Sequence, residues 1–256
     1  MTLRVVAVAG LVTVQDLGRP GFMHQGVPPG GALVPAFLRA ANGAVGNQGG
    51  DAALEVLGRV VLEATEGAVL ATEDGHVRRL HAGETLAIEP LPDRRVRYGA
   101  IQGGRDVPVT MGSRSTLVVA GIGGFEGRGL RRGDGLVARP FSGALATAPR
   151  GLTFGGDIAV ASGPNGGAPV GEYVILAASN RVGTRLSGPA IVVEALGGSA
   201  PLVKGAIEVP PDGMPIVLGP EHPTTGGYPV VGVLREEDLD RFFALPVGSK
   251  VRFRAS

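Results

Sequence analysis

The segment at residues 205–234 reads GAIEVPPDGMPIVLGPEHPTTGGYPVVGVL and contains three short apolar runs. The runs at residues 206–209, 216–218 and 230–233 are rich in Val and Ile, and Pro-Pro-Asp-Gly and Gly-Gly-Tyr-Pro between them are typical of turns. Runs of three or four residues are too short for an ordinary helix. The segment therefore predicts short β-strands joined by tight turns and one polar loop.

The same pattern of apolar runs and turns continues along the 256 residues, which include 44 Gly and 20 Pro. Helical spacing occurs in residues 34–45, where Phe37, Leu38 and Ala41 share one face, and in residues 236–245, whose first turn is acidic. Short strands at regular spacing indicate a sandwich or barrel, so the predicted fold class is all-β, mainly β with two short helices. The other expected strands are residues 4–8, 56–61, 68–71, 85–88, 94–98, 116–119, 158–161, 173–177, 190–194 and 250–253.

Residues 140–156 form the best candidate linker, because they are rich in Gly, Ala, Pro and Thr and lack hydrophobic periodicity. A chain of this length forms one large domain or two small ones. We therefore expect an N-terminal β unit over residues 1–140 and a C-terminal β unit over residues 141–256. The alternative is one continuous β unit that this loop crosses.

Composition excludes several classes of protein. The chain has no Cys, so it has no disulfides or thiolate metal sites, and its net charge of +1 gives no electrostatic basis for binding nucleic acid or a membrane. The four His lack zinc-binding spacing, and no phosphate-binding loop or hydrolase elbow appears. The apolar run at residues 5–14 lacks a signal-peptide cleavage site, so we expect a cytoplasmic protein that binds no metal.

Two segments of the N-terminal half are candidate binding loops. Residues 13–31 place Gln15, Asp16 and Arg19 among glycines and prolines, which would fix the loop before a ligand arrives. Asp16 and Arg19 either pair to hold this loop or contact a ligand. The second segment, residues 123–134, has three Arg within five residues between glycines and is either a solvated hairpin or an anion-facing loop.

Arg114 and Ser115 lie in a third polar segment, GSRST at residues 112–116. An arginine beside hydroxyl groups suits a carboxylate or a phosphate. A turn with a solvated arginine and serines bonded to the local backbone explains the same pattern.

The loop at residues 219–229 concentrates polar side chains after a predicted strand. A histidine next to a carboxylate suits proton transfer near neutral pH, and the hydroxyl groups would orient a substrate. The alternative is a structural loop whose hydroxyl groups are satisfied internally. The candidate residues here are Glu221, His222, Thr224, Thr225 and Tyr228.

Together these segments resemble the biotin-dependent carboxyltransferase-domain family, whose members include allophanate hydrolase subunit 2, KipA and the C subunit of 5-oxoprolinase. The similarity runs from about residue 11 to residue 253. It implies a fold of two cyclophilin-like β-barrel units. The matching stretches are TVQDLGRPG (residues 13–21), GVPPGGA (26–32), GSRST (112–116), GGFEGRGLRRGD (123–134) and residues 205–234.

The resemblance implies a component like the C subunit of an ATP-dependent 5-oxoprolinase, which converts 5-oxo-L-proline to L-glutamate. Its expected partners are a KipI-like protein, equivalent to the B subunit of 5-oxoprolinase, and a third subunit. ATP with Mg is expected for the complex and no cofactor for this chain, which we expect to be inactive alone. One alternative is a carboxyltransferase component of a urea carboxylase or allophanate system, which uses carboxybiotin made elsewhere. The other is a non-catalytic KipA-like regulator that binds a KipI-like kinase inhibitor.

Within this function, residue chemistry predicts catalytic roles for Glu221, His222 and Tyr228. Asn180 stands where the family has Asp, and Glu208 and Pro223 stand where it has Gln, so the activity or the substrate is expected to differ if the family pocket uses those groups. The residues predicted to bind substrate are Gln15, Asp16, Arg19, Arg114, Ser115, Thr224 and Thr225.

Overall fold

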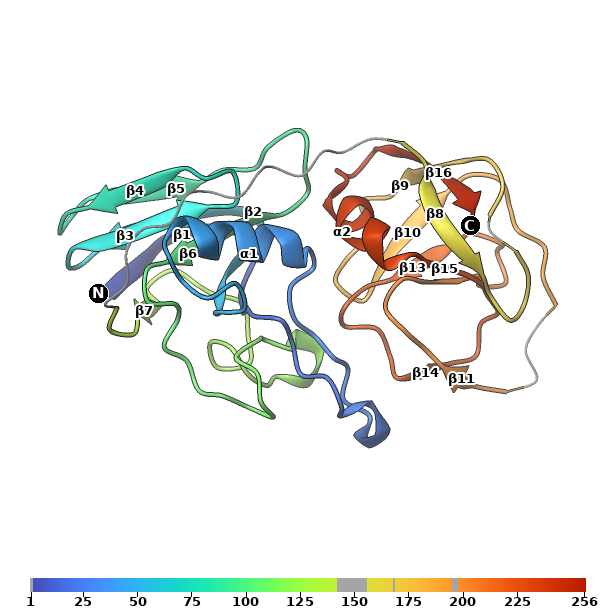
Figure 1. Ribbon diagram of the computed structural model, residues 1–256, viewed down its shortest axis with the longest axis horizontal. Helices are drawn as coiled ribbons and strands as arrows, with labels where there is room; N and C mark the ends of the chain where they lie inside the picture. The colour runs from blue at the N-terminus through green and yellow to red at the C-terminus, as the bar shows by residue number, and fades with distance from the viewer. Residues whose placement is uncertain (1, 142–155, 168, 195–197) are drawn as a thin grey trace. The chain divides into compact units, whose positions relative to one another are not determined.

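The computed structural model describes residues 2–141, 156–167, 169–194 and 198–256 (Figure 1). The chain divides into two compact units: Met1–Arg19 with Gly30–Leu152, and Pro20–Pro29 with Thr153–Ser256. Most of the predicted linker, residues 142–155, lies outside the described residues. The boundary at residues 140/141 therefore stays a prediction.

The first unit is built on a long antiparallel hairpin. Strand β1 (Thr2–Gln15) pairs with β2 (Ala53–Ala64) from Leu3 opposite Ala64 to Gln15 opposite Ala53. The sheet has seven strands in the order β4-β3-β6-β2-β1-β7, and β5 also pairs with β2. Its other strands are β3 (Ala68–Thr72), β4 (Val77–Leu80), β5 (Thr85–Ile88), β6 (Arg97–Ile101) and β7 (Gly135–Val137).

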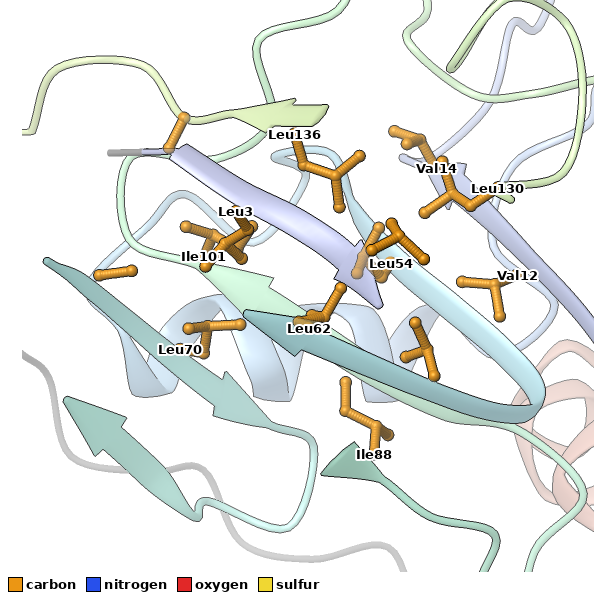
Figure 2. Packing of buried hydrophobic residues seen from close by; sticks show 14 of the residues in the cluster. Leu3, Val12, Val14, Leu54, Leu62, Leu70, Ile88, Ile101, Leu130 and Leu136 are labelled. Atoms are coloured by element: carbon orange, nitrogen blue, oxygen red, sulfur yellow. The ribbon is translucent and has the colours of Figure 1, made fainter. Parts of the chain in front are cut away.

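The hydrophobic core of this unit lies on one face of the hairpin (Figure 2). Leu54 and Leu62 in β2 are fully buried, because side chains of one face recur at every second residue of a strand. In β1 a β-bulge between Val5 and Ala7 shifts this alternation by one residue, so that both Leu3 and Val12 are buried in the same core. Each such leucine contributes about 1.5–3 kcal/mol by burial. The end of this hairpin at Gln15 leads directly into the polar loop that sequence analysis singled out.

Helix α1 (Pro35–Ala44) packs against β6 and β3. Pro35 suits the first helical position, where its missing N–H is not needed, and Phe37 and Leu38 are buried on the packed face. Gly46, with φ of 75°, follows the helix end. This confirms the helix predicted for residues 34–45.

The second unit contains a closed barrel of order β10-β13-β12-β15-β8-β16-β9 and a small sheet of β11 with β14. Helix α2 (Glu236–Ala244) is fastened to the barrel because Asp238 accepts a hydrogen bond from the amide of Ala159 at 2.7 Å. The all-β class with two α-helices is thus confirmed. The strands are β8 (Ile158–Ser162), β9 (Glu172–Ile175), β10 (Gly183–Ser187), β11 (Ala200–Pro201), β12 (Ala206–Glu208), β13 (Ile216–Leu218), β14 (Thr225–Gly226), β15 (Val230–Leu234) and β16 (Lys250–Ala255).

Two expected strands are wrong. Residues 116–119 lead into a 3₁₀ turn, Val118–Ala120, which ends at Gly121 with φ of 64°. Residues 190–194 form no strand, and Val192 is 96% exposed. In both places the β-branched residues favour an extended chain, but a strand needs a continuous ladder of backbone hydrogen bonds. Among the described residues the ladder does not continue here beyond isolated bonds, such as those from the Thr116 amide to the Val14 carbonyl and from the Ile191 amide to the Gly213 carbonyl.

Gly58 in β2 and Gly83 in the turn before β5 allow a matched test of backbone packing. Both have positive φ, 129° and 84°, but a Cβ at Gly58 would collide with the carbonyl oxygen of Ala9, whereas a Cβ at Gly83 meets nothing within 4 Å. We expect Gly58→Ala to lower the free energy of unfolding by about 3 kcal/mol or more, and Gly83→Ala by about 1 kcal/mol, because only the first adds a collision to the backbone strain. Urea unfolding measures both, and equal losses would contradict the close approach.

Candidate functional site

Asp16 connects two of the polar segments of the first unit. Its Oδ1 accepts hydrogen bonds from the Gly18 amide at 2.8 Å and from the Ser113 hydroxyl at 2.6 Å, and its Oδ2 accepts from the Arg114 amide at 2.5 Å. The carboxylate therefore holds the loop after β1 against the GSRST segment. We call Gln15, Asp16, Arg19, Ser113, Arg114 and Ser115 the opening cluster.

Arg19 is 1% exposed and donates from Nη2 to the carbonyl oxygen of Ser115. A Cβ at Gly123 would lie 2.6 Å from that Nη2, and a Cβ at Gly30 would lie 3.2 Å from Nη1. Glycine at these positions therefore leaves the space that the guanidinium occupies. The sequence motifs around Arg19, Ser115 and Gly123 thus meet at one buried cation.

Three more predicted substrate-binding residues also contact the protein itself. The Gln15 amide donates to Thr13 Oγ1 and to the Thr116 carbonyl, both at 3.0 Å, and Ser115 is fully buried. Asp16 is occupied as described above. Substrate contacts by these residues and by Arg19 stay predictions.

Arg114 is placed differently. Its side chain is half-buried, and its Nε donates to the Val107 carbonyl at 3.0 Å. Its terminal amino groups donate to no acceptor within the described part of the chain. Because the Nε bond fixes the guanidinium while those donors stay available, Arg114 is the member of the opening cluster best suited to hold an anion.

In the second unit, Glu221 forms a buried ion pair with Arg181. Glu221 Oε1 accepts from Arg181 Nε at 2.6 Å, and both side chains are 3% exposed. Sequence analysis placed this carboxylate beside His222 as a proton-transfer pair; the structure shows Arg181 as its ion-pair partner, and the catalytic role of Glu221 stays a prediction. Arg181 was not among the predicted site residues. Its only signal was its place in the SNRVG stretch that resembles the family.

His222 is 1% exposed, and its Nδ1 lies 2.7 Å from the carbonyl oxygen of Pro223. Since a carbonyl only accepts, Nδ1 carries the proton and Nε2 is the basic nitrogen. Burial lowers the pKa of His222, the Pro223 bond opposes that shift, and the charge of Lys204 adds to it. His222 is therefore a neutral imidazole at pH 7, able to accept a proton at Nε2.

Asn180 stabilises a turn through its side chain, at a position where the family that the sequence resembles has Asp. Its Oδ1 accepts from the amides of Val182 at 2.9 Å and Gly183 at 3.1 Å. An amide oxygen serves this purpose as a carboxylate does. The substitution therefore preserves the local backbone that carries Arg181.

Tyr228 is 44% exposed and lines a cavity of about 540 Å³ in the second unit. The lining is mainly apolar, with Val209 and Pro211 as examples and Asp212 as its one carboxylate. Thr225 is exposed in β14, and Thr224 is half-buried. The roles predicted for these hydroxyl groups stay predictions.

Glu208 is a feature that residue chemistry did not select. It is 6% exposed, its Oε1 has no hydrogen-bond partner among the described residues, and a Cβ at Gly226 would lie 2.6 Å from that oxygen. Burial raises the pKa of the Glu208 carboxyl, which favours its neutral form. The only sequence signal for Glu208 was a carboxyl where the family has an amide.

Residues 25–255 match the family model described as carboxyltransferase domain, subdomain A and B. The chain belongs to this family. It is 33% identical to the C subunit of 5-oxoprolinase from Escherichia coli (strain K12), over 98% of this chain and 90% of that protein. It is also 28% identical to the urea amidolyase of Saccharomyces cerevisiae, over 94% of this chain but 16% of the yeast protein. The family predicted from the motifs is thus confirmed.

Solved structures agree with this membership. The chain superposes on K. lactis urea amidolyase with a TM-score of 0.88 and 27% identity, over 98% of this chain and 18% of that one. A second solved chain gives a TM-score of 0.86 at 28% identity, with 56% of it covered. This carboxyltransferase-domain protein therefore spans only part of those longer chains.

Among the described residues, no helix is long and apolar enough to cross a membrane. Within the same ranges, no group of three or more His, Cys, Asp or Glu side chains is arranged to hold a metal ion.

Replacement of Asp16 tests its connecting role. Asn offers one accepting oxygen, so Asp16→Asn must lose at least one of three hydrogen bonds to a charged acceptor. We expect the free energy of unfolding to fall by about 1.5–3 kcal/mol. Asp212→Asn is the control, because Asp212 accepts one bond through Oδ1, from Met214, which Asn can retain. Equal urea midpoints for the two variants would rule out the connecting role.

Glu208 predicts a pH dependence of stability. Because its pKa is raised in the folded state, the folded chain binds more protons, and the free energy of unfolding falls as pH rises from the usual carboxyl pKa through the raised value. Glu208→Gln removes this titration, so it should raise Tm at neutral pH, with the gain vanishing near about pH 4. Calorimetry from acidic to neutral pH measures this, with exposed Glu237→Gln as control. A gain that does not change with pH would contradict it.

Proposed function

We propose that this chain is a component like the C subunit of an ATP-dependent 5-oxoprolinase, which opens 5-oxo-L-proline to L-glutamate. The proposal includes a KipI-like partner, equivalent to the B subunit of that enzyme, and a third subunit, in the cytoplasm. The observation that carries it is the 33% identity to a protein named as the C subunit of 5-oxoprolinase, over nearly the full length of both chains. A second relative of the same name, from Haemophilus influenzae, is 30% identical over 98% of this chain.

Opening a lactam breaks the ring C–N bond, adds water to the carbonyl carbon and returns a proton to the leaving nitrogen. The substrate also carries a carboxylate, which needs a cationic partner to hold it. Arg114 offers such a partner, with its guanidinium fixed by the Val107 carbonyl. Recognition of the substrate carboxylate by Arg114 is the chemical content of the proposal for the first unit. The proton-transfer role of His222, in the second unit, stays a separate prediction.

The proposal assigns ATP and Mg to the partner subunits. The chain lacks a phosphate-binding loop, and its described residues present no cluster of three metal-ligating side chains. It follows that the isolated chain should show little turnover.

Reconstitution tests the function. We expect ATP-dependent release of glutamate from 5-oxoproline when the chain is combined with its two partner subunits, and none from the chain alone. Arg114→Met should lower kcat/KM by about 10–100-fold, mainly through KM, because a charge-assisted hydrogen bond to the substrate is lost. Exposed Arg132→Met is the matched control. Full turnover by the chain alone would contradict the proposed C-subunit function, and an unchanged KM in Arg114→Met would contradict the role of Arg114 in substrate binding.

A second candidate function is carboxyl transfer from carboxybiotin made by another chain. It is favoured by the TM-score of 0.88 to K. lactis urea amidolyase. The cavity lined by Tyr228 and Asp212 has a volume of about 540 Å³, enough for the ring system of carboxybiotin, and the Tyr228 hydroxyl would orient its ureido group there. Recovery of a biotinylated carboxylase with the tagged chain, and bicarbonate-dependent turnover, would favour this function. Tight binding of a KipI-like protein without any turnover would favour the non-catalytic KipA-like regulator. In that case Arg114→Met should bind the KipI-like protein with unchanged affinity.

A further inference from the structure

A second cavity, of about 360 Å³, lies in the first unit beside the opening cluster. One of its walls is apolar and is formed by Val107, Pro108 and Phe125. All five residues of the GGFEG segment at residues 123–127, which we call the glycine cradle, also line this cavity. The cavity lies at the lower end of the size range of small-molecule sites. The remaining lining residues are Thr110, Gly121, Gly123, Gly124, Glu126 and Gly127.

The backbone of the glycine cradle is left-handed at four of its five residues. The φ angles are 69° at Gly123, 52° at Gly124, 54° at Glu126 and 68° at Gly127. Successive main-chain amides that include left-handed residues form concave sites for anions. In the described structure the amides of residues 123–126 donate to no protein acceptor, whereas the Gly127 amide donates to the Gly123 carbonyl at 2.8 Å. Four consecutive residues that line the cavity therefore carry amides without a protein acceptor in the described ranges.

Packing holds this backbone in place. A Cβ at Gly124 would collide with Thr116 Oγ1, and a Cβ at Gly127 would collide with the Gly121 carbonyl. Glu126 keeps a positive φ despite its side chain, a conformation that costs free energy unless the surroundings enforce it. Because the donors are fixed before a ligand arrives, binding would lose little conformational entropy.

The charges around the glycine cradle favour an anion. Arg114 is anchored to the carbonyl of Val107, a lining residue, and its terminal amino groups have no acceptor in the described ranges. The buried guanidinium of Arg19 lies directly behind Gly123. The nearest lining carboxylate, Glu126, is paired with Arg128 at 2.8 Å, which offsets its charge. The backbone geometry of the glycine cradle and the charges around it thus both favour an anion.

We propose that the glycine cradle and Arg114 bind the carboxylate of a small molecule whose apolar body lies against Phe125, Val107 and Pro108. This inference rests on the proposed function in that the molecule would be the substrate, 5-oxoproline, or the product. The site itself requires no turnover. The main-chain amides hold the carboxylate oxygens, and Arg114 completes the recognition from the side.

Amide NMR of the full-length chain tests the site directly. Addition of 5-oxoproline should shift the amide resonances of residues 123–126 in a saturable manner, and its neutral carboxamide should not. Inorganic phosphate is the third probe. Equal shifts with the carboxamide, or no shift with 5-oxoproline, overturn the proposal, and tighter saturation by phosphate replaces the carboxylate assignment with a phosphoryl one.

Two variants locate the binding. Thr110→Trp fills the cavity and should weaken 5-oxoproline binding at least tenfold, whereas Val109→Trp, at a neighbouring residue that is 53% exposed and not part of the lining, should not. Arg114→Met is the second variant, with about a tenfold loss expected. Wild-type affinity in folded Thr110→Trp or Arg114→Met overturns the site. Binding of 5-oxoproline without turnover in the reconstituted complex would instead contradict the proposed function. Turnover without the amide shifts would contradict the binding site alone.

Discussion

The Asp16 carboxylate is the interaction on which the first unit's polar site depends. It accepts from Gly18, Ser113 and Arg114, residues separated by nearly a hundred positions in the chain. A carboxylate that accepts two or three bonds from fixed donors gains more than neutral pairs would. The consequence is that the loop after β1, the GSRST segment and the glycine cradle form one body around Arg19.

The Arg181–Glu221 pair has a comparable place in the second unit. Both side chains are buried, so removal of either would leave an uncompensated charge. The pair orders the main chain that leads to His222, whose Nδ1 is committed to Pro223. Neither Glu221 nor Arg181 needs to touch a substrate to matter, because together they fix where the imidazole lies.

Sequence patterns predicted the helices at residues 34–45 and 236–245 and most strands, because amphipathic spacing and Gly or Pro at turns are local properties. They failed at residues 116–119 and 190–194, where β-branched residues form no continuous ladder of backbone hydrogen bonds. Motif content also located the polar segments and the family. It did not show that Arg181 is the ion-pair partner of Glu221, because the two residues are forty positions apart in the chain.

The sequence by itself determined the β class, the absence of cysteine chemistry and membership of the carboxyltransferase-domain family. Only the tertiary structure showed that, among the described residues, a buried Glu208 oxygen has no hydrogen-bond partner, the terminal amino groups of Arg114 meet no acceptor, and four amides of the glycine cradle donate to no protein acceptor. Burial and hydrogen-bond satisfaction depend on what surrounds an atom in space. Residues distant in the chain supply those surroundings, so no local pattern encodes them.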